Sequence, residues 1–258
     1  MSKTQTQETL PFSDAPYIVF SDFDGTITTR DSNDCATDEL GFGLEKRREL
    51  NIDILNGTKT FRDAFKEMLD SVCQAGHSFD QVVEYLRKEI KLDPGFKVFF
   101  DYCKSEKIPV VIVSSGMVPI IRAILTNLLG PSDASQIPII ANDVELLSED
   151  GKRWTIKYKH PESGFGHDKS RATAPYRDLE HKPTLFFCGD GVSDLSAARA
   201  ADLLFVKVIK DHTNDLQVHC VREQIPYVPF SQFEQVKDVV KSVVDKEMTV
   251  QQHLDAKK

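Results

Sequence analysis

Short apolar runs that each end at a polar or acidic residue constrain the fold of this chain more than any other feature. The four clearest runs are Tyr17–Ser21, Ile108–Val113, Ile137–Ala141 and Thr184–Cys188. Their continuous apolar character over a few residues is typical of parallel strands buried on both faces. Leu203–Val206 and Tyr227–Phe230 are predicted as two shorter strands of the same kind.

Segments with helical periodicity separate these runs. They cover roughly residues 95–106, 117–128, 168–179, 192–200 and 212–224. Strands that alternate with helices form right-handed βαβ units. We therefore expect an α/β fold with a doubly wound, Rossmann-like and mostly parallel sheet, whose ligands bind at the carboxyl ends of its strands.

Two stretches interrupt that alternation. Residues 30–92 contain no convincing strand and four helix-like segments, at 34–41, 44–55, 60–75 and 78–90. Residues 144–158 alternate around Asp150-Gly151, which is a strong β-hairpin signal. The tail after Lys241 is predicted to be a charged surface helix.

These patterns divide the chain into three expected parts. Residues 1–15 are expected to be a disordered leader, because they are polar and lack a secretory signal. Residues 16–29 and 93–258 form the core domain, and residues 30–92 form a small helical cap domain inserted after the first strand.

Composition limits the possible partners and location. The chain of 258 residues has 32 Lys and Arg against 40 Asp and Glu, which disfavours nucleic acid as a partner. The five cysteines, at 35, 73, 103, 188 and 220, form no CxxC pair, so we expect free thiols. No apolar run is long enough to span a membrane. We expect a cytoplasmic protein that can also diffuse into the nucleus, with its oligomeric state left open.

Polar residues gather at the expected carboxyl edge of the sheet. They are Asp22, Asp24, Ser114, Asp190 and Asp194. Carboxylates two residues apart on an extended segment share a face and repel unless a cation or a proton separates them. An all-oxygen cluster without His or Cys favours Mg²⁺ over zinc. One carboxylate can attack phosphorus, and a second can transfer the proton.

The acidic run Asp22-Phe23-Asp24-Gly25-Thr26 resembles the first motif of the haloacid dehalogenase-like (HAD) hydrolases. Three further motifs follow in order. Val113-Ser114-Ser115-Gly116 resembles the second, Gly166-His167-Asp168-Lys169-Ser170 the third, and Gly189-Asp190-Gly191-Val192-Ser193-Asp194 the fourth.

The resemblance implies a role for each matching residue. Asp22 would be the nucleophile and a metal ligand. Asp24 would be the general acid and base, with its backbone carbonyl on the metal. Asp190 would bind the metal directly, and Asp194 directly or through water. Ser114 would bind the phosphate through its hydroxyl, and Lys169 would brace both the nucleophile and the phosphate. Backbone N–H groups near Phe23, Ser115 and Gly116 would hold phosphate oxygens. His167 is expected to fix Lys169 rather than to react.

The inserted helices resemble the small C1-type cap of phosphoserine phosphatases, which places substrate choice in the cap. Asp31 stands where those enzymes hold an acid that meets the substrate amine. Met68 stands where an arginine would bind the substrate carboxylate, and Arg62 on the same predicted helix could substitute for it. The polar run 28–34 suits either hydroxyl binding or a helix N-cap. Because a thioether cannot pair with a carboxylate, we rank phosphoserine below a neutral, hydroxyl-rich substrate.

The whole chain is similar to fungal phosphoserine-phosphatase-like proteins that act on polyol phosphates. This resemblance implies a phosphoric monoester hydrolase for sugar-alcohol or glycerol phosphates, acting through an aspartyl-phosphate with Mg²⁺. A phosphoserine phosphatase or other metabolite phosphatase is the alternative, and a non-catalytic phospho-ligand-binding protein is a weaker one.

Overall fold

The computed structural model describes residues 10–209 and 214–256. Within these residues the strands form a seven-stranded sheet in the order β4-β3-β2-β1-β5-β6-β7. The strands are β1 (Tyr17–Ser21), β2 (Val110–Met117), β3 (Ile139–Leu146), β4 (Trp154–Lys157), β5 (Thr184–Gly189), β6 (Leu203–Lys207) and β7 (Val228–Phe230). All neighbours pair in parallel except β3 and β4. The doubly wound α/β sheet and the hairpin predicted from the sequence are confirmed.

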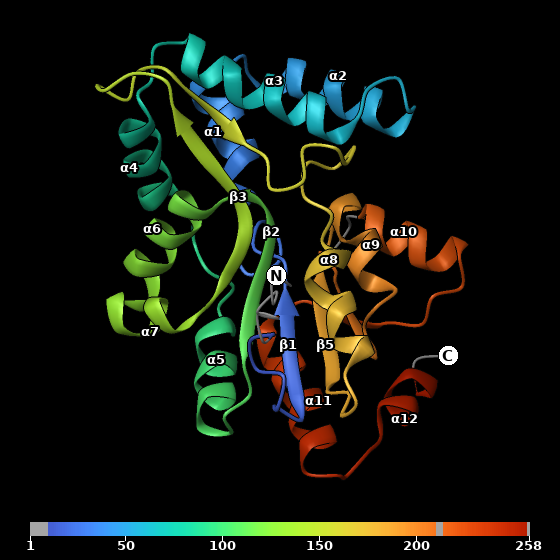
Figure 1. The fold of residues 1–258 in the computed structure, drawn as a ribbon. Coiled ribbons are helices and arrows are strands. Elements are labelled where there is room, and N and C mark those ends of the chain that lie inside the picture. The colour runs from blue at the N-terminus through green and yellow to red at the C-terminus, as the bar shows by residue number, and fades with distance from the viewer. Residues whose placement is uncertain (1–9, 210–213, 257–258) are drawn as a thin grey trace, which may run out of the picture.

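Both faces of the sheet are covered, which explains why its strands are apolar without alternation. On β1, Val19 packs into one core cluster while Ile18 and Phe20 pack into the other. The first cluster lies against α5 (Phe96–Ser105), α6 (Val118–Leu129) and α11 (Phe233–Val244). The second lies against α8 (Ser170–Thr173), α9 (Leu195–Ala198) and α10 (Asp215–Arg222). Strand β1 is thus central, and the acidic run that follows it leaves from the middle of the sheet (Figure 1).

The inserted segment folds into four helices, as its sequence predicts. They are α1 (Ser32–Leu40), α2 (Leu44–Leu55), α3 (Phe61–Gln74) and α4 (Phe79–Glu89). Figure 1 shows α2 and α3 lying across the top of the sheet, beyond its carboxyl edge. Helix α3 packs on β4, and Trp154 of β4 donates its indole N–H to the carbonyl of His77 at 3.0 Å. The β3–β4 hairpin therefore packs against the inserted helices through β4.

The chain enters and leaves the insertion at adjacent points, since Thr28 and Leu92 form an isolated antiparallel bridge. We keep 30–92 as the proposed cap domain on this basis. Residues 1–9 of the expected leader lie outside the described residues. Within residues 10–15, Leu10 and Ala15 pack against the second core cluster, and Tyr176 donates its hydroxyl to the carbonyl of Pro11.

Several predicted boundaries differ from the structure. Strand β2 continues past Val113 to Met117, and β3 continues through Asn142 to Leu146, so one long strand serves both the sheet and the hairpin. The helix predicted over 168–179 is only α8 followed by a 3₁₀ helix, Ala174–Asp178. Pro175 explains the break, because proline cannot donate the next helical hydrogen bond.

Other helices were misjudged in length or not predicted. The helix predicted over 192–200 is a 3₁₀ turn (Val192–Asp194) followed by α9, and α10 occupies the described part of 212–224. Helices α7 (Pro131–Gln136) and α11 were not predicted as separate elements. The tail ends in α12 (Val250–Asp255), where Leu254 is buried. All five cysteines are free, and the described residues include no helix that is long and apolar enough to cross a membrane.

Candidate active site

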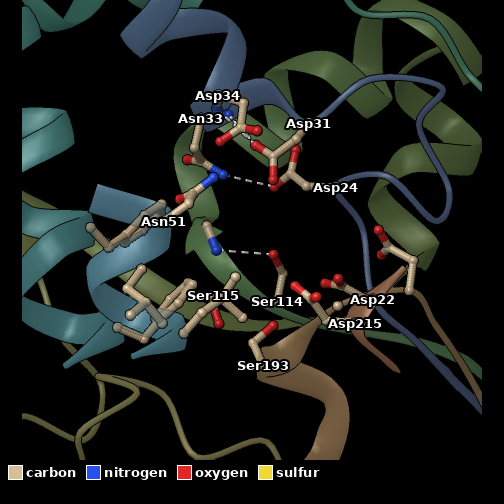
Figure 2. A pocket seen from close by; sticks show the side chains of 17 residues that line it. Asp22, Asp24, Asp31, Asn33, Asp34, Asn51, Ser114, Ser115, Ser193 and Asp215 are labelled. Carbon is tan, nitrogen blue, oxygen red and sulfur yellow. Dashed lines mark hydrogen bonds between the residues drawn. The ribbon is translucent and has the colours of Figure 1, made fainter. Parts of the chain in front are cut away.

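The carboxyl edge of the sheet holds a cavity of about 300 Å³ beneath the cap (Figure 2). Side chains from the ends of three strands meet there, since Asp22 follows β1, Ser114 lies near the end of β2 and Asp190 follows β5. The lining residues are Asp22, Asp24, Asp31, Asn33, Asp34, Asn51, Ile54, Leu55, Phe61, Phe65, Ser114, Ser115, Gly116, Asp190, Gly191, Ser193 and Asp215. Residues that are far apart in sequence are thus brought to one site.

Lys169, which does not line the cavity, forms ion pairs with two carboxylates. Its Nζ lies 2.8 Å from Oδ1 of Asp22 and 2.7 Å from Oδ1 of Asp194, and the side chain is fully buried. The carboxylates raise the pKa of Lys169 against the opposing effect of burial, so the ammonium stays charged. The pKa of Asp22 rises to about 7, first through burial and then through Asp194, while Lys169 opposes the rise. A further cation at the site would favour the ionised form of Asp22.

Asp190 and Asp194 are positioned by backbone N–H groups and by the turn after β1. Thr26 donates its hydroxyl to Oδ1 of Asp190 at 2.7 Å. The N–H groups of Asp190 and Gly191 donate to Oδ2 of Asp194 at 3.0 and 3.1 Å. Asp22, Asp190 and Asp194 each place an oxygen within 4.8 Å of the others. This largely buried all-oxygen triad is a candidate cation site.

Gly25 makes the close approach of the two acidic loops possible. Its φ of +75° favours glycine, and a Cβ there would lie 2.5 Å from Oδ2 of Asp190. Position 25 of the DxDGT motif therefore requires glycine both for its positive φ and for the close contact with Asp190.

Asp24 points into the cavity and is held by the first turn of α1. Its Oδ1 accepts the N–H of Ser32 at 2.8 Å. Its Oδ2 accepts the side-chain amide of Asn33 at 3.0 Å, as Figure 2 shows. Burial first, and the nearby Asp31 next, raise the pKa of Asp24 well above its usual value, although Ser32 opposes this. A buried carboxyl with a raised pKa can carry a proton at neutral pH.

The segment from Ser114 to Gly116 is fixed from behind by two side chains. Asn142 donates its amide to the carbonyl of Ser115 at 2.7 Å, and Nδ1 of His167 lies 2.7 Å from the carbonyl of Ser114. Burial lowers the pKa of His167 to about 4, so its ring is neutral and donates this bond. His167 therefore braces the strand that carries Ser114, and it is fully buried away from the cavity lining.

Of the three cap residues predicted to bind substrate, the structure places Asp31 at the cavity and Arg62 and Met68 elsewhere. Asp31 lines the cavity, and it also caps α1 by accepting the N–H groups of Asn33 and Asp34. Arg62 binds Asp63 and the carbonyl of Pro161, and Met68 is buried in the cap core. Among the described residues, neither Arg62 nor Met68 lines the cavity.

Several lining residues were not predicted individually. The cap supplies Asn51, Ile54 and Leu55 from α2 and Phe61 and Phe65 from α3. The core supplies Ser193 and Asp215. Phe61 and Phe65 are four residues apart on one helical face, and Asn51 and Leu55 repeat that spacing, so a signal was present. The sequence does not say which face turns toward the acidic edge.

Comparison with known proteins identifies the family. Residues 19–199 match the family model described as haloacid dehalogenase-like hydrolase. The chain belongs to this family. The phosphoric monoester hydrolase predicted from the four HAD motifs is confirmed.

Two fungal proteins are similar to nearly the whole chain. The polyol phosphate phosphatase PYP1 of Saccharomyces cerevisiae is 44% identical over 242 residues, which cover 90% of this chain and 96% of that protein. The Pdp3-interacting factor 1 of Schizosaccharomyces pombe is 48% identical over 227 residues, which cover 87% of this chain and 93% of that protein.

Solved structures resemble the fold at much lower identity. A substrate-bound phosphoserine phosphatase complex superposes with a TM-score of 0.60 at 14% identity, covering 86% of this chain and 97% of that chain. The likeness to a phosphoserine phosphatase therefore concerns the fold of the HAD core and cap.

Proposed function

We propose that this HAD hydrolase is a Mg²⁺-dependent phosphatase that cleaves small polyol phosphates, such as sugar-alcohol or glycerol phosphates, through an aspartyl-phosphate on Asp22. One observation carries the mechanism: the buried Lys169 forms an ion pair with Asp22. A second buried carboxyl, that of Asp24, follows Asp22 by two positions. The name of the yeast relative supports the substrate class.

The residues at the site fit a magnesium ion. The triad offers only carboxylate oxygens, which are the donors that Mg²⁺ prefers. The described hydrogen bond to Asp190 engages Oδ1, which leaves Oδ2 available as a ligand. Both oxygens of Asp194 accept hydrogen bonds, which favours contact through water. We propose Asp22, Asp190 and the backbone carbonyl of Asp24 as direct ligands. When bound, Mg²⁺ would neutralise charge on the transferring phosphoryl group.

In the first step, an oxygen of Asp22 attacks phosphorus and the ester P–O bond breaks. Asp24 gives its proton to the departing alkoxide, so the alcohol leaves neutral. Lys169, the hydroxyl of Ser114 and the N–H groups of Phe23, Ser115 and Gly116 would bind the phosphoryl oxygens and stabilise their charge.

In the second step, water attacks the phosphorus of the aspartyl-phosphate. Asp24, now ionised, takes a proton from the water, and the bond from phosphorus to Asp22 breaks. Inorganic phosphate leaves, and both carboxyls return to their starting states. Asp24 thus serves as acid and then as base, which suits a group whose pKa burial raises.

The charge of the cavity supports a neutral leaving group. Its lining, in the described part of the chain, contains six aspartates and no lysine or arginine. The carboxylate of phosphoserine would therefore meet acidic side chains without a cationic partner. Amides of Asn33 and Asn51 can meet hydroxyl groups, while Ile54 and Phe65 can pack on a carbon chain. A neutral polyol can form hydrogen bonds with the amides and pack its carbon chain on the apolar side chains.

Kinetics on a panel of phosphate monoesters test this proposal. We expect Mg²⁺-dependent turnover with the highest kcat/KM on glycerol, ribitol or sorbitol phosphate, and a much lower value on phosphoserine. The highest kcat/KM on phosphoserine would contradict the substrate class. Asp22→Asn should abolish turnover, and unchanged Mg²⁺-dependent turnover in that variant would rule out the covalent mechanism. Absence of turnover by the wild type on every ester of the panel would instead favour a non-catalytic, ligand-binding role. Free thiols at all five cysteines support the proposed cytoplasmic location.

A further inference from the structure

Lys207, the last residue of β6, carries a buried charge that the proposed chemistry does not use. Its Nζ forms an ion pair with the carboxylate of Asp93 and lies 5.1 and 5.7 Å from the ring centroids of Phe230 and Phe233. The Lys207 side chain is 7% exposed and that of Asp93 is 1% exposed. The pair thus sits inside a largely aromatic part of the core.

Stability alone does not account for this ion pair. Replacing a buried ion pair by apolar residues of similar volume is often neutral or stabilising, because the charges lose their hydration. Phe230 and Phe233 already provide an apolar environment into which an aliphatic residue would fit. The contacts of the pair point instead to a role in positioning other groups.

Those contacts lead to the candidate cation site. Nζ of Lys207 donates to the carbonyl of Thr26 at 3.4 Å, and the hydroxyl of the same Thr26 donates to Oδ1 of Asp190 at 2.7 Å. Thr26 is fully buried, whereas Asp190 lines the cavity. One residue thus separates the buried ammonium from a proposed metal ligand.

Asp93 fixes the same turn from the other side. Its N–H donates to the carbonyl of Ile27 at 2.8 Å, while its Oδ1 accepts the N–H groups of Gly95 and Phe233. The ion pair therefore joins three points: the turn after β1, the return from the cap and the start of α11. Thr26 contacts this junction through its carbonyl, which accepts from Lys207.

We propose that Lys207 is a positioning residue for the metal site, which holds Thr26 so that the Thr26 hydroxyl orients the carboxylate of Asp190. This inference rests on the metal site of the proposed function. Residues that orient metal ligands through hydrogen bonds typically change metal affinity by 10- to 100-fold when they are removed. The link through a backbone carbonyl is indirect, so we expect the lower end of that range.

Direct binding of Mg²⁺ to the substrate-free protein tests this role, measured by calorimetry alongside thermal unfolding. We expect Lys207→Met and Thr26→Val each to raise the Mg²⁺ dissociation constant about tenfold. We expect the double variant to bind no more weakly than Thr26→Val alone, because Lys207 acts through Thr26. At saturating Mg²⁺, kcat should be largely restored in Lys207→Met.

Phe230→Leu is the matched control, since it disturbs the packing around Lys207 without removing a hydrogen bond to Thr26. It should lower the unfolding temperature and leave the Mg²⁺ dissociation constant unchanged. If Lys207→Met also binds Mg²⁺ like the wild type, Lys207 is merely structural and the inference is overturned.

A second variant guards against loss of folding in Lys207→Met, which leaves Asp93 buried without its partner. Lys207→Met combined with Asp93→Asn removes both charges and should fold. It should also bind Mg²⁺ about tenfold more weakly, and wild-type affinity in it would overturn the inference. Absence of Mg²⁺ binding by the wild type would instead contradict the proposed metal and this inference together.

Discussion

Asn33, the second residue of cap helix α1, donates its side-chain amide to Oδ2 of Asp24 at 3.0 Å. The preceding residue, Ser32, donates its N–H to the other oxygen of Asp24. The proposed acid and base of the HAD core is therefore oriented by the first turn of the cap. In the proposed mechanism, a segment that resembles a specificity domain would thus also contribute to proton transfer.

Removing this amide should slow the chemistry more than it weakens binding. We expect Asn33→Ala to lower kcat roughly tenfold, which is less than the rate enhancement that a positioned acid and base provides. KM should change much less. Steady-state kinetics on the best polyol phosphate measure both constants. Asn51→Ala, which removes another cavity amide that makes no described bond to Asp24, should mainly raise KM. An unchanged kcat in Asn33→Ala would show that Ser32 alone orients Asp24.

Gly25 should be indispensable for the metal site, whereas another glycine with positive φ should not. Gly25→Ala places a Cβ 2.5 Å from Oδ2 of Asp190, so we expect metal-dependent activity to be lost. Gly57→Ala is the matched control, because Gly57 has a φ of +71° and its Cβ would meet nothing within 4 Å. It should cost about 1 kcal/mol of stability through backbone strain alone. Equal activity losses in the two variants would mean that strain, and not the contact with Asp190, decides the outcome.

Mg²⁺ should stabilise the protein more at pH 8 than at pH 5.5. Burial raises the pKa of Asp22 from 3.8 to about 7, so the metal-free folded state binds more protons than the unfolded state between these values. The contribution of Asp22 to metal-free stability is therefore present below pH 4 and is lost as pH rises through about 7. Mg²⁺ needs the ionised carboxylate, so its effect grows over the same range.

Thermal unfolding with Mg²⁺ or with chelator, at both pH values, measures this linkage. The shift caused by Mg²⁺ should be the larger one at pH 8. In Asp22→Asn the residue no longer titrates, so the pH dependence of the shift should shrink. An equal Mg²⁺ shift at the two pH values in the wild type would argue against Asp22 as a ligand.

His167 should make the protein sensitive to acid. Its pKa is lowered from 6.5 to about 4 by burial, so between these values the unfolded state binds more protons than the folded state. Stability contributed by neutral His167 is complete above pH 6.5 and is lost as pH falls toward 4. The loss is about 3 kcal/mol, at 1.36 kcal/mol for each pKa unit.

His167→Asn keeps an N–H donor for the carbonyl of Ser114 and removes the titrating ring. Relative to the wild type, we expect this variant to gain stability as pH falls from 6.5 to 4, measured by urea unfolding at each pH. His181→Asn changes an exposed histidine and serves as the control. A constant difference between His167→Asn and the wild type across this range would contradict the assigned burial effect.

Local patterns predicted most of the strands and helices and placed the acidic residues at one edge. They failed where an element's length depends on distant partners. Strand β3 continues to Leu146 because β4 pairs with its second half, and α8 ends early because Pro175 follows it. The register of the cap was also beyond local reasoning, since Met68 faces the cap core and Arg62 faces solvent and Pro161.

The sequence by itself determined the order of the strands and of most helices, the four HAD motifs and hence the class of chemistry, because periodicity and motif spacing are encoded in neighbouring residues. Only the tertiary structure decided how the motifs are held. Lys169 reaches Asp194 across 25 positions, and Lys207 reaches Thr26 across 181. Such contacts depend on how whole strands and helices pack, and packing places a lysine beside a particular carbonyl without a local signal.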